Sequence, residues 1–298
     1  MAVFALSQVA RAQESAATEK CVASPSGLIG WWRGEGDAND VLSKESATLD
    51  TASYATGKVG RAFSFANSET TLRFAGNEKR NNETQNGFTL EFWVNPRNAE
   101  PSEPLVEFRK DDQNVGVHLW IYDQAGMIWG NVMDTTGNHH VISTGPGLLL
   151  PNVWQHIALV YDRAGTGSIY LNGALVARKD IGSFAPQMSH DLFLGGHRPN
   201  DPDTRFYRGA LDEVSLYSRP LAGSEISTIY RAGAAGKCVP GQTFATASTR
   251  ASGTEPPAAT LPSVAQTPVA AKNQPQKPAP KSSKTGAAST RKISSTNS

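Results

Sequence analysis

The sequence predicts an all-β protein, a β-sandwich or jelly roll with one short C-terminal helix. Apolar and polar residues alternate with period two in several short segments, as in strands with one buried face. Gly, Asn, Asp and Pro interrupt these segments at even spacing, which is typical of turns. Roughly a dozen short strands joined by such turns indicate a sandwich or jelly roll.

The alternating segments are the candidate strands. In 88–94, Phe, Leu, Phe and Val alternate with Thr, Glu and Trp, so one set of side chains is expected to face the core. Segment 168–171 precedes Asn172-Gly173 and 174–177, which predicts a hairpin with a two-residue turn. The other clearly alternating segments are 117–122 and 154–161.

One segment near the end of this region has helical spacing. Ser224 can cap its start, Ile226, Ile229 and Tyr230 fall on one face, and Gly233 ends it. The sequence therefore predicts a single short helix after the last strand.

The two ends of the chain differ from its middle. Residues 1–20 hold a short apolar run and a small-x-small tripeptide at 10–12, so we interpret them as a signal-peptide remnant and leader. Residues 239–298 are rich in Ala, Ser, Thr, Pro and Lys and poor in bulky apolar residues, which predicts a disordered basic tail. A single domain, 21–238, lies between them.

Charge is unevenly divided along the chain. The whole chain has 28 basic and 27 acidic residues, and seven of the basic but one of the acidic residues lie in 240–298. The tail could touch an anionic polymer, or it could serve as a solubilising linker. No nucleic-acid partner is expected, and no membrane span, because no stretch approaches the roughly 20 apolar residues that cross a bilayer. The oligomeric state stays open.

Two cysteines, Cys21 and Cys238, bracket the domain. In an oxidising compartment two cysteines would most simply pair, which would bring the two ends of the domain together. With the leader, this predicts a disulfide-bonded protein that is secreted, periplasmic or at the cell surface.

Motifs occur along the domain in a specific order. Segment 30–40 has the form of an opening strand and loop, and segment 57–65 has the form of the next strand. Segment 88–96 fits the pattern F-T-[IL]-E-x-W-V-x-P. Further matches follow in order at 154–158, 161–162, 170–173, 211–221 and 232–233.

Together these motifs resemble the laminin-G-like jelly-roll domains of the concanavalin A-like lectin/glucanase superfamily, in a bacterial-type secreted variant. The resemblance covers about residues 22–238 and implies a concanavalin A-like jelly-roll β-sandwich. The variant also carries a Cys before the first strand and a Lys-Cys after the final helix, as Cys21 and Lys237-Cys238 do here.

The resemblance leaves the activity open, because this fold carries lectins, sugar-binding modules, glycosidases, calcium-dependent binders and adhesion domains. The E-x-D-x-E run that holds the carboxylate pair of its glycosidases is missing. Glu91 and Glu107 stand singly on strands, and the adjacent Asp212 and Glu213 are expected to point to opposite faces of theirs. No H-E-x-x-H, G-x-S-x-G or P-loop motif occurs, so no catalytic residue is predicted.

The loop after the first strand is the candidate metal site. Four residues with oxygen-bearing side chains fall within six positions: Glu35, Asp37, Asn39 and Asp40. Calcium takes six to eight such hard oxygen ligands, some of them backbone carbonyls. By the resemblance, Asp212 or Glu213 could complete the shell of a structural calcium. The alternative is a solvated turn whose Asp and Asn side chains bond their own backbone.

The alternating direction of side chains along two predicted strands suggests a ligand surface. If Val117, Leu119 and Ile121 face the core, the side chains between and after them face outward, and the next strand adds two more. These outward residues are His118, Trp120, Tyr122, Trp129 and Asn131. Aromatic faces with polar groups between them suit a sugar, which offers apolar CH groups for stacking and hydroxyls for hydrogen bonds. The other tryptophans, Trp31, Trp32, Trp93 and Trp154, are expected to be structural.

The sequence thus predicts an exported, non-catalytic module that binds a glycan or another surface polymer. A first alternative is a protein-interaction or adhesion module on a flexible tail. A second is a glycosidase whose carboxylates converge from distant segments. Aromatic side chains open to water on a concave sheet would favour the glycan binder. An apolar patch elsewhere would favour the adhesion module. Convergent carboxylates in a groove would favour the enzyme.

Overall fold

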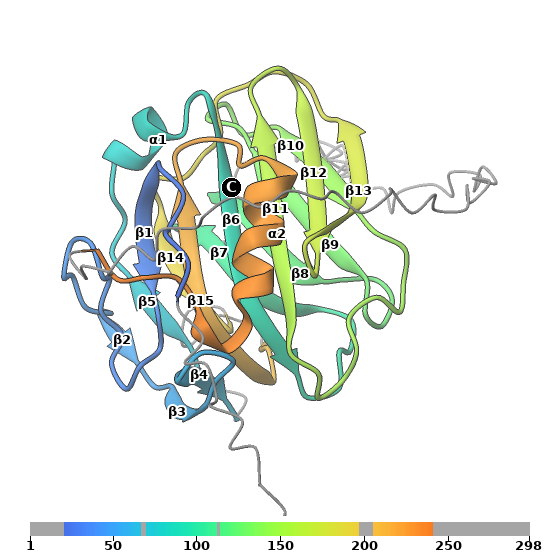
Figure 1. Ribbon diagram of the computed structural model, residues 1–298. Coiled ribbons are helices and arrows are strands. Elements are labelled where there is room, and N and C mark those ends of the chain that lie inside the picture. Colours follow the sequence, from blue (N-terminus) through green and yellow to red (C-terminus); the bar gives the residue numbers. More distant parts are fainter. Residues whose placement is uncertain (1–20, 67–69, 112–113, 197–204, 241–298) are drawn as a thin grey trace, which may run out of the picture. The chain divides into compact units, whose positions relative to one another are not determined.

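A computed structural model gives the structure of the domain (Figure 1). It describes residues 21–66, 70–111, 114–196 and 205–240. The predicted leader, 1–20, and nearly all of the predicted tail, 239–298, lie outside these residues. The described part is a sandwich of two antiparallel sheets, as the sequence predicts.

One sheet has eight strands in the order β13-β12-β11-β6-β15-β4-β3, with β1 paired to β15. Its strands are β1 (Leu28–Trp32), β3 (Ser53–Thr56), β4 (Arg61–Phe65), β6 (Gly87–Pro96), β11 (Gln155–Asp162), β12 (Thr166–Leu171), β13 (Ala174–Asp180) and β15 (Gly209–Tyr217).

The other sheet has seven strands in the order β10-β9-β8-β7-β14-β5-β2. They are β2 (Leu49–Asp50), β5 (Leu72–Phe74), β7 (Glu103–Arg109), β8 (Val115–Ile121), β9 (Ile128–Met133), β10 (His139–Ser143) and β14 (Asp191–Leu194). Runs of consecutive strands pair with one another, as in β11-β12-β13 and β7-β8-β9-β10, whereas β6, β14 and β15 pair with strands distant in sequence, so the fold also needs long-range pairing.

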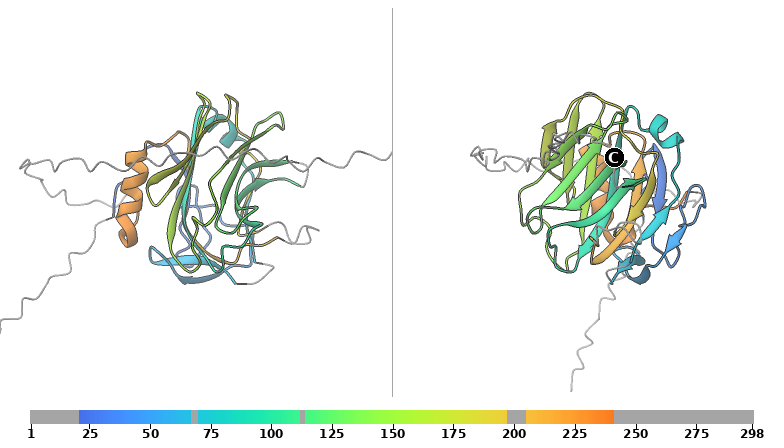
Figure 2. Two further views of the ribbon diagram at one scale, coloured as in Figure 1. Left: turned by 90° about the vertical axis from the view of Figure 1, so that its right-hand side faces the viewer. Right: turned by 180° about the vertical axis from the view of Figure 1, so that it is seen from behind.

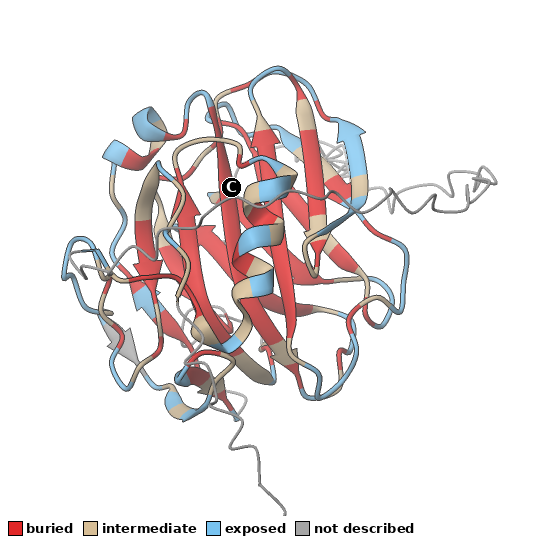
Figure 3. Cartoon of the chain, viewed as in Figure 1, coloured by how far each residue is buried: buried red, intermediate tan, exposed pale blue. Residues whose placement is uncertain are grey.

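The core lies between the two sheets, where the strands are buried along most of their length (Figure 3). β6 contributes Phe88, Leu90 and Phe92, all fully buried, and β8 contributes alternate apolar residues from the facing sheet. Burying a side chain of this size stabilises the fold by about 1.5–3 kcal/mol. The alternation predicted for both segments is therefore confirmed.

The C-terminal helix α2 (Gly223–Ala232) packs on the outer face of the eight-stranded sheet (Figure 2). Ile226 and Ile229 are its buried side chains, and they join a small apolar cluster with β11 and β15. The N-cap is Ala222, two residues before the predicted Ser224, and Glu225 accepts a hydrogen bond from the Ala222 N–H at 2.9 Å. Gly233, with φ of 55°, ends it as predicted.

Two short helices were not expected from the sequence. α1 (Lys79–Glu83) is a single polar turn, and η1 (Gly233–Ala235) follows α2 directly. Neither has an apolar stripe long enough to be recognised by periodicity. Among the described residues, no helix is long and apolar enough to cross a membrane.

The predicted hairpin joins β12 and β13. Asn172 and Gly173 have φ values of 51° and 77°, and positive φ at both central residues matches a two-residue hairpin turn. Asn and Gly adopt this conformation at low cost, which explains why this turn could be placed from the sequence.

The two ends of the domain meet at the predicted disulfide. Cys21 and Cys238 are bonded, with their Cα atoms 5.0 Å apart across a sequence separation of 217. Beside the bond, the N–H of Cys238 donates to Val22 O at 2.8 Å and the N–H of Val22 donates to Gly236 O at 3.0 Å. The N-terminal segment and the segment after α2 therefore form a short parallel pair.

A β-bulge corrects the expectation for Asp212 and Glu213. Glu213 has φ of 57°, and the register between β15 and β6 shifts between Asp212 and Ser215. The extra residue places both acidic side chains on the outer side of the sheet, while Leu211 and Val214 face the core. Simple alternation failed here because a bulge changes the period of the strand.

Candidate functional site

The five residues predicted as a ligand surface lie together on the outer face of the seven-stranded sheet. We call this group the aromatic face: His118, Trp120, Tyr122, Trp129 and Asn131. In the pairing of β8 with β9, Trp120 lies opposite Trp129 and His118 opposite Asn131. The intervening residues of β8 belong to the core, so the predicted outward direction of these side chains is confirmed.

The aromatic rings of this face form one continuous cluster. Tyr122 and Trp129 are stacked, with ring centroids 4.8 Å apart, and His118 lies 5.2 Å from Trp129. Trp120 meets the Tyr122 ring edge-on at 6.1 Å. Such pairs stabilise one another by about 0.5–1.5 kcal/mol, so the ring positions are fixed before any ligand arrives.

Exposure differs sharply within the aromatic face. Trp129 and Tyr122 are partly exposed, whereas Trp120 is 6% exposed, His118 8%, and Asn131 is fully buried. The expectation that Trp120 is open to solvent is therefore corrected. The stacked Tyr122–Trp129 pair forms the accessible part, and the other three residues support it.

Trp120 is held by two charged side chains that sequence reasoning missed. Its Nε1–H donates to Glu107 Oε1 at 2.8 Å, and the guanidinium of Arg205 lies 4.8 Å from the centroid of its ring. Glu107 is buried and faces His118 across the β7–β8 pair. Register shifts in the pairing of β7 with β8 interrupt the regular alternation there, so the neighbours of Glu107 in the sequence do not predict its contact with Trp120.

The side chain of Asn131 forms polar contacts with its neighbours. Its Nδ2 lies 2.7 Å from His139 Nδ1 and 3.4 Å from His118 Nε2, and its Oδ1 accepts a hydrogen bond from the His140 N–H at 3.2 Å. The amide therefore orients two histidines at the edge of the aromatic face. A role in positioning fits this geometry better than direct contact with a ligand.

The candidate calcium loop makes local hydrogen bonds. Asp40 accepts from the N–H groups of Trp31 at 2.9 Å, Leu42 at 3.1 Å and Ser43 at 3.3 Å. Asp37 accepts from the Asn39 N–H at 3.0 Å. Bonds of this kind are those of a turn whose Asp side chains cap their own backbone.

The remaining candidate ligands have partners elsewhere. The Asn39 Oδ1 accepts a hydrogen bond from the Ser46 hydroxyl, and Glu35 pairs with Arg33 at 3.2 Å. Asp212 Oδ2 accepts from the Val59 N–H at 2.9 Å, while its buried Oδ1 has no hydrogen-bond partner among the described residues. Burial raises the pKa of Asp212 to about 8, with Glu213 and Glu35 adding to the rise and two backbone N–H groups opposing it.

The six predicted metal ligands thus do not share one shell. Within the part of the chain that the structure describes, no three His, Cys, Asp or Glu side chains are grouped as a metal site requires. Calcium binding stays a prediction, and the residues in place fit a hydrogen-bonded turn.

A cluster of ionisable side chains is buried beneath the ends of the domain. We call it the ionic cluster: Glu91, His156, Glu213 and Lys237. Lys237 Nζ lies 3.0 Å from Glu91 Oε1 and 3.3 Å from Glu213 Oε2, and His156 Nε2 lies 2.9 Å from Glu91 Oε2. All four side chains are buried.

Charge pairing outweighs burial for Glu91 and Lys237, whereas burial prevails for Glu213 and raises its pKa. Burial alone would raise the pKa of Glu91, but Lys237 and His156 lower it overall. Burial alone would lower the pKa of Lys237, but Glu91 and Glu213 raise it overall. Two carboxylates do converge here, yet a lysine lies between them and solvent is excluded, so the cluster does not offer the open groove of a glycosidase.

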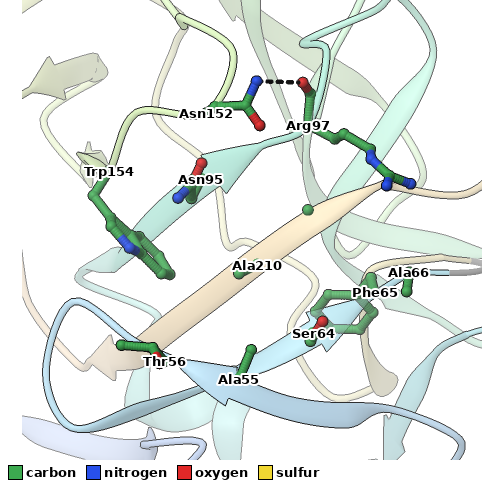
Figure 4. A pocket seen from close by; sticks show the side chains of 11 residues that line it. Ala55, Thr56, Ser64, Phe65, Ala66, Asn95, Arg97, Asn152, Trp154 and Ala210 are labelled. Carbon is green, nitrogen blue, oxygen red and sulfur yellow. Dashed lines mark hydrogen bonds between the residues drawn. The ribbon is translucent and has the colours of Figure 1, made fainter.

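Trp154 departs from its expected structural role. It is partly exposed and lines a hollow of about 300 Å³ on the outer face of the eight-stranded sheet (Figure 4). Trp31, Trp32 and Trp93 are buried, as expected. Trp154 lies one residue before β11. The alternation of side chains along a strand does not predict which segments pack on a residue at this position.

Comparison with known proteins shows the family of this chain. Residues 67–227, more than half of the chain, match a laminin-G-type family model described as the concanavalin A-like lectin/glucanases superfamily. A segment of 155 residues is 26% identical to the botulinum-like toxin eBoNT/J of Enterococcus sp. (strain 3G1_DIV0629). That match covers 48% of this chain but 12% of the toxin.

Solved structures with a similar fold include the binding domains of several toxins. The binding domain of Paraclostridial Mosquitocidal Protein 1 matches with a TM-score of 0.55 at 19% identity, over 68% of this chain and 52% of that one. Domain 4 of AbnA, an extracellular arabinanase from Geobacillus stearothermophilus, was solved with arabinotriose. It matches with a TM-score of 0.50 at 17% identity, over 67% of this chain and 96% of that one. At these identities the likeness shows a shared fold.

Proposed function

Because this chain belongs to the concanavalin A-like lectin/glucanases superfamily, we propose that it is an exported, non-catalytic binding module that recognises a glycan through its aromatic face. The partly exposed Tyr122–Trp129 stack carries the proposal. A sugar ring placed against it would cover apolar surface, and its hydroxyls would meet the polar edge of the face.

The supporting residues make this face suitable for binding. The Glu107 carboxylate and the Arg205 guanidinium fix Trp120, and the Trp120 ring in turn contacts Tyr122. A surface whose rings are already oriented loses little side-chain freedom when a ligand binds. Preorganisation of this kind favours a binding function.

The comparisons support a binding module in general terms. The similar domain of the arabinanase was solved with arabinotriose, and a similar binding domain of botulinum neurotoxin DC was solved both with SialylT and with rat synaptotagmin II. Those domains therefore include both glycan and protein binders. The stacked pair favours a glycan for this chain.

A protein-binding or adhesion role is the second candidate. Strand β13 is the edge of the eight-stranded sheet, and its Leu175 and Val176 are 47% and 36% exposed. An exposed edge strand with apolar side chains can pair with a strand of another protein. Lys179, further along the same strand, is an exposed charge of the kind that discourages such pairing.

A glycan array tests the proposal directly. The purified domain and its Trp129→Ala variant are applied to the same array, and Trp129→Phe serves as the matched control because it keeps an aromatic ring. Glycans bound by the domain and by Trp129→Phe, but lost with Trp129→Ala, would support the proposal. Binding that is unchanged in Trp129→Ala would contradict it.

A further inference from the structure

We propose that the Trp154 hollow, on the sheet opposite the aromatic face, is a second binding site that takes a single sugar ring carrying a carboxylate. Its volume of about 300 Å³ lies at the lower end of the range for ligand sites, about 300–1,000 Å³, which suits one ring. The site stands on its own observations and does not depend on the aromatic face.

Small residues form the floor of the hollow. Ala210 of β15 lies opposite Ser64 of β4, and Ala55 of β3 lies beside them in the same sheet. Gly209 cannot carry a side chain, because a Cβ there would collide with the Asn95 carbonyl oxygen and the Tyr207 hydroxyl. A short α2 covers another part of this sheet face, so the region of small residues stays open as a depression.

Two larger side chains flank this floor. Figure 4 shows Trp154 on one side of Ala210 and Arg97 on the other, with Asn95 between them. Asn152 ties these walls together, since its N–H donates to Pro96 O at 2.7 Å and its Nδ2 donates to Arg97 O at 3.1 Å. The spacing of the indole and the Arg97 backbone is therefore set by the protein.

The polar groups that line the hollow are available to a ligand. The Arg97 guanidinium, the Asn95 amide and the Trp154 indole N–H make no hydrogen bond or ion pair with any residue that the structure describes. Each of the three can donate a hydrogen bond, and the indole also offers an apolar face for stacking.

Charge decides which sugar fits best. Arg97 is the only charged residue among the 11 described residues that line the hollow, so none of the others is an Asp or Glu. A guanidinium binds a carboxylate through two parallel hydrogen bonds, a geometry that a neutral hydroxymethyl group cannot match. Uronic acids and sialic acids both supply a ring with a carboxylate, so this is the shared ligand chemistry.

Nuclear magnetic resonance titration of the ¹⁵N-labelled protein tests the proposal. The Trp154 indole signal, assigned with Trp154→Phe, is followed while methyl α-galacturonide, methyl α-sialoside or the neutral methyl α-galactoside is added. We expect saturable shifts with at least one acidic sugar, at an affinity about tenfold or more above that for the neutral one. The acidic sugar that binds identifies the source of the carboxylate.

Variants separate the role of charge from that of shape. Arg97→Gln should weaken binding of the acidic sugar about tenfold and leave the neutral sugar unchanged, whereas Arg178→Gln, at an exposed position on β13, should change neither. Equal affinity for acidic and neutral sugars, or no shift of the Trp154 signal with any of the three, would overturn the proposal. Shifts of the Trp129 signal report on the aromatic face, so the failure of one site is distinguishable from failure of the other.

Discussion

Lys237 Nζ lies 3.0 Å from Glu91 Oε1, in a position where the lysine side chain is 1% exposed. Lys237 is also the residue before Cys238, whose bond to Cys21 closes the domain. The disulfide and the parallel backbone pair at Val22 therefore hold the lysine over the two carboxylates of the ionic cluster. The two ends of the domain therefore complete the ionic cluster as well as the covalent closure.

Removing this lysine should strongly destabilise the domain. Lys237→Met removes the buried cation that Glu91 and Glu213 share and leaves them with His156 and Arg33 as ion-pair partners, and breaking a buried pair of this kind costs about 3–5 kcal/mol. Unfolding by urea measures the loss, with Lys79→Met, at an exposed position of α1, as the control. A loss no larger than that of the control would contradict a role for the ionic cluster in stability.

The disulfide and Lys237 should act together. Cys21→Ser with Cys238→Ser opens a loop of more than 200 residues, for which chain entropy gives a loss of at most about 5 kcal/mol. Because the disulfide positions Lys237, combining these changes with Lys237→Met should cost less than the sum of the separate losses. Thiol titration of the denatured, unreduced wild type should detect no free thiol, and strictly additive losses would argue against the coupling.

Glu103 should make the domain less stable as pH rises. Burial raises its pKa to about 7 from an ordinary value of about 4.5, and Arg208 opposes this only in part. Between these two values the unfolded chain has lost the proton and the folded protein still holds it, so the free energy of unfolding should fall as pH increases from about 4.5 to about 7.

Glu103→Gln tests this dependence, because glutamine has the same shape and does not titrate. Urea unfolding of both proteins at a series of pH values should show the wild type losing stability relative to the variant across that window. The expected difference is on the order of 1–3 kcal/mol. Parallel curves for the two proteins would show that Glu103 ionises normally in the folded state.

On the aromatic face, Trp129 and Trp120 should behave differently. Trp129→Ala should weaken glycan binding by about 1–3 kcal/mol and leave the fold unchanged by circular dichroism. Trp120→Ala should also reduce stability, because Trp120 is buried and its loss leaves Glu107 without the indole donor. Titration calorimetry and thermal melting of both variants separate the effects, and equal losses of stability would contradict the assignment of Trp129 as the accessible ring.

Calcium should raise the melting temperature if the loop from Glu35 to Asp40 binds it, since a ligand of the folded state stabilises by mass action. A chelator should reverse the rise, and Asp37→Ala should abolish it. Asp123→Asn, in an exposed loop elsewhere, is the control. Identical melting curves with calcium and with chelator would leave the loop as a hydrogen-bonded turn.

Local patterns were enough to predict much of this protein. Alternation in β6 and β8 predicted which residues face the core, because the side-chain period of a strand follows from backbone geometry alone. The Asn172-Gly173 turn and the pairing of Cys21 with Cys238 were predictable for similarly direct reasons, namely the φ preference of two residue types and the presence of two cysteines.

The tertiary structure decided what covers each outward face, since packing between distant segments sets exposure. The sequence predicted an outward-facing Trp120 and a structural Trp154, but Glu107 and Arg205 enclose Trp120, whereas small residues beside Trp154 leave a hollow. The bulge at Glu213 follows from pairing across the sheet, which no short sequence window contains. The burial of Lys237 likewise needed both ends of the domain to meet, because its partners lie far away in the sequence.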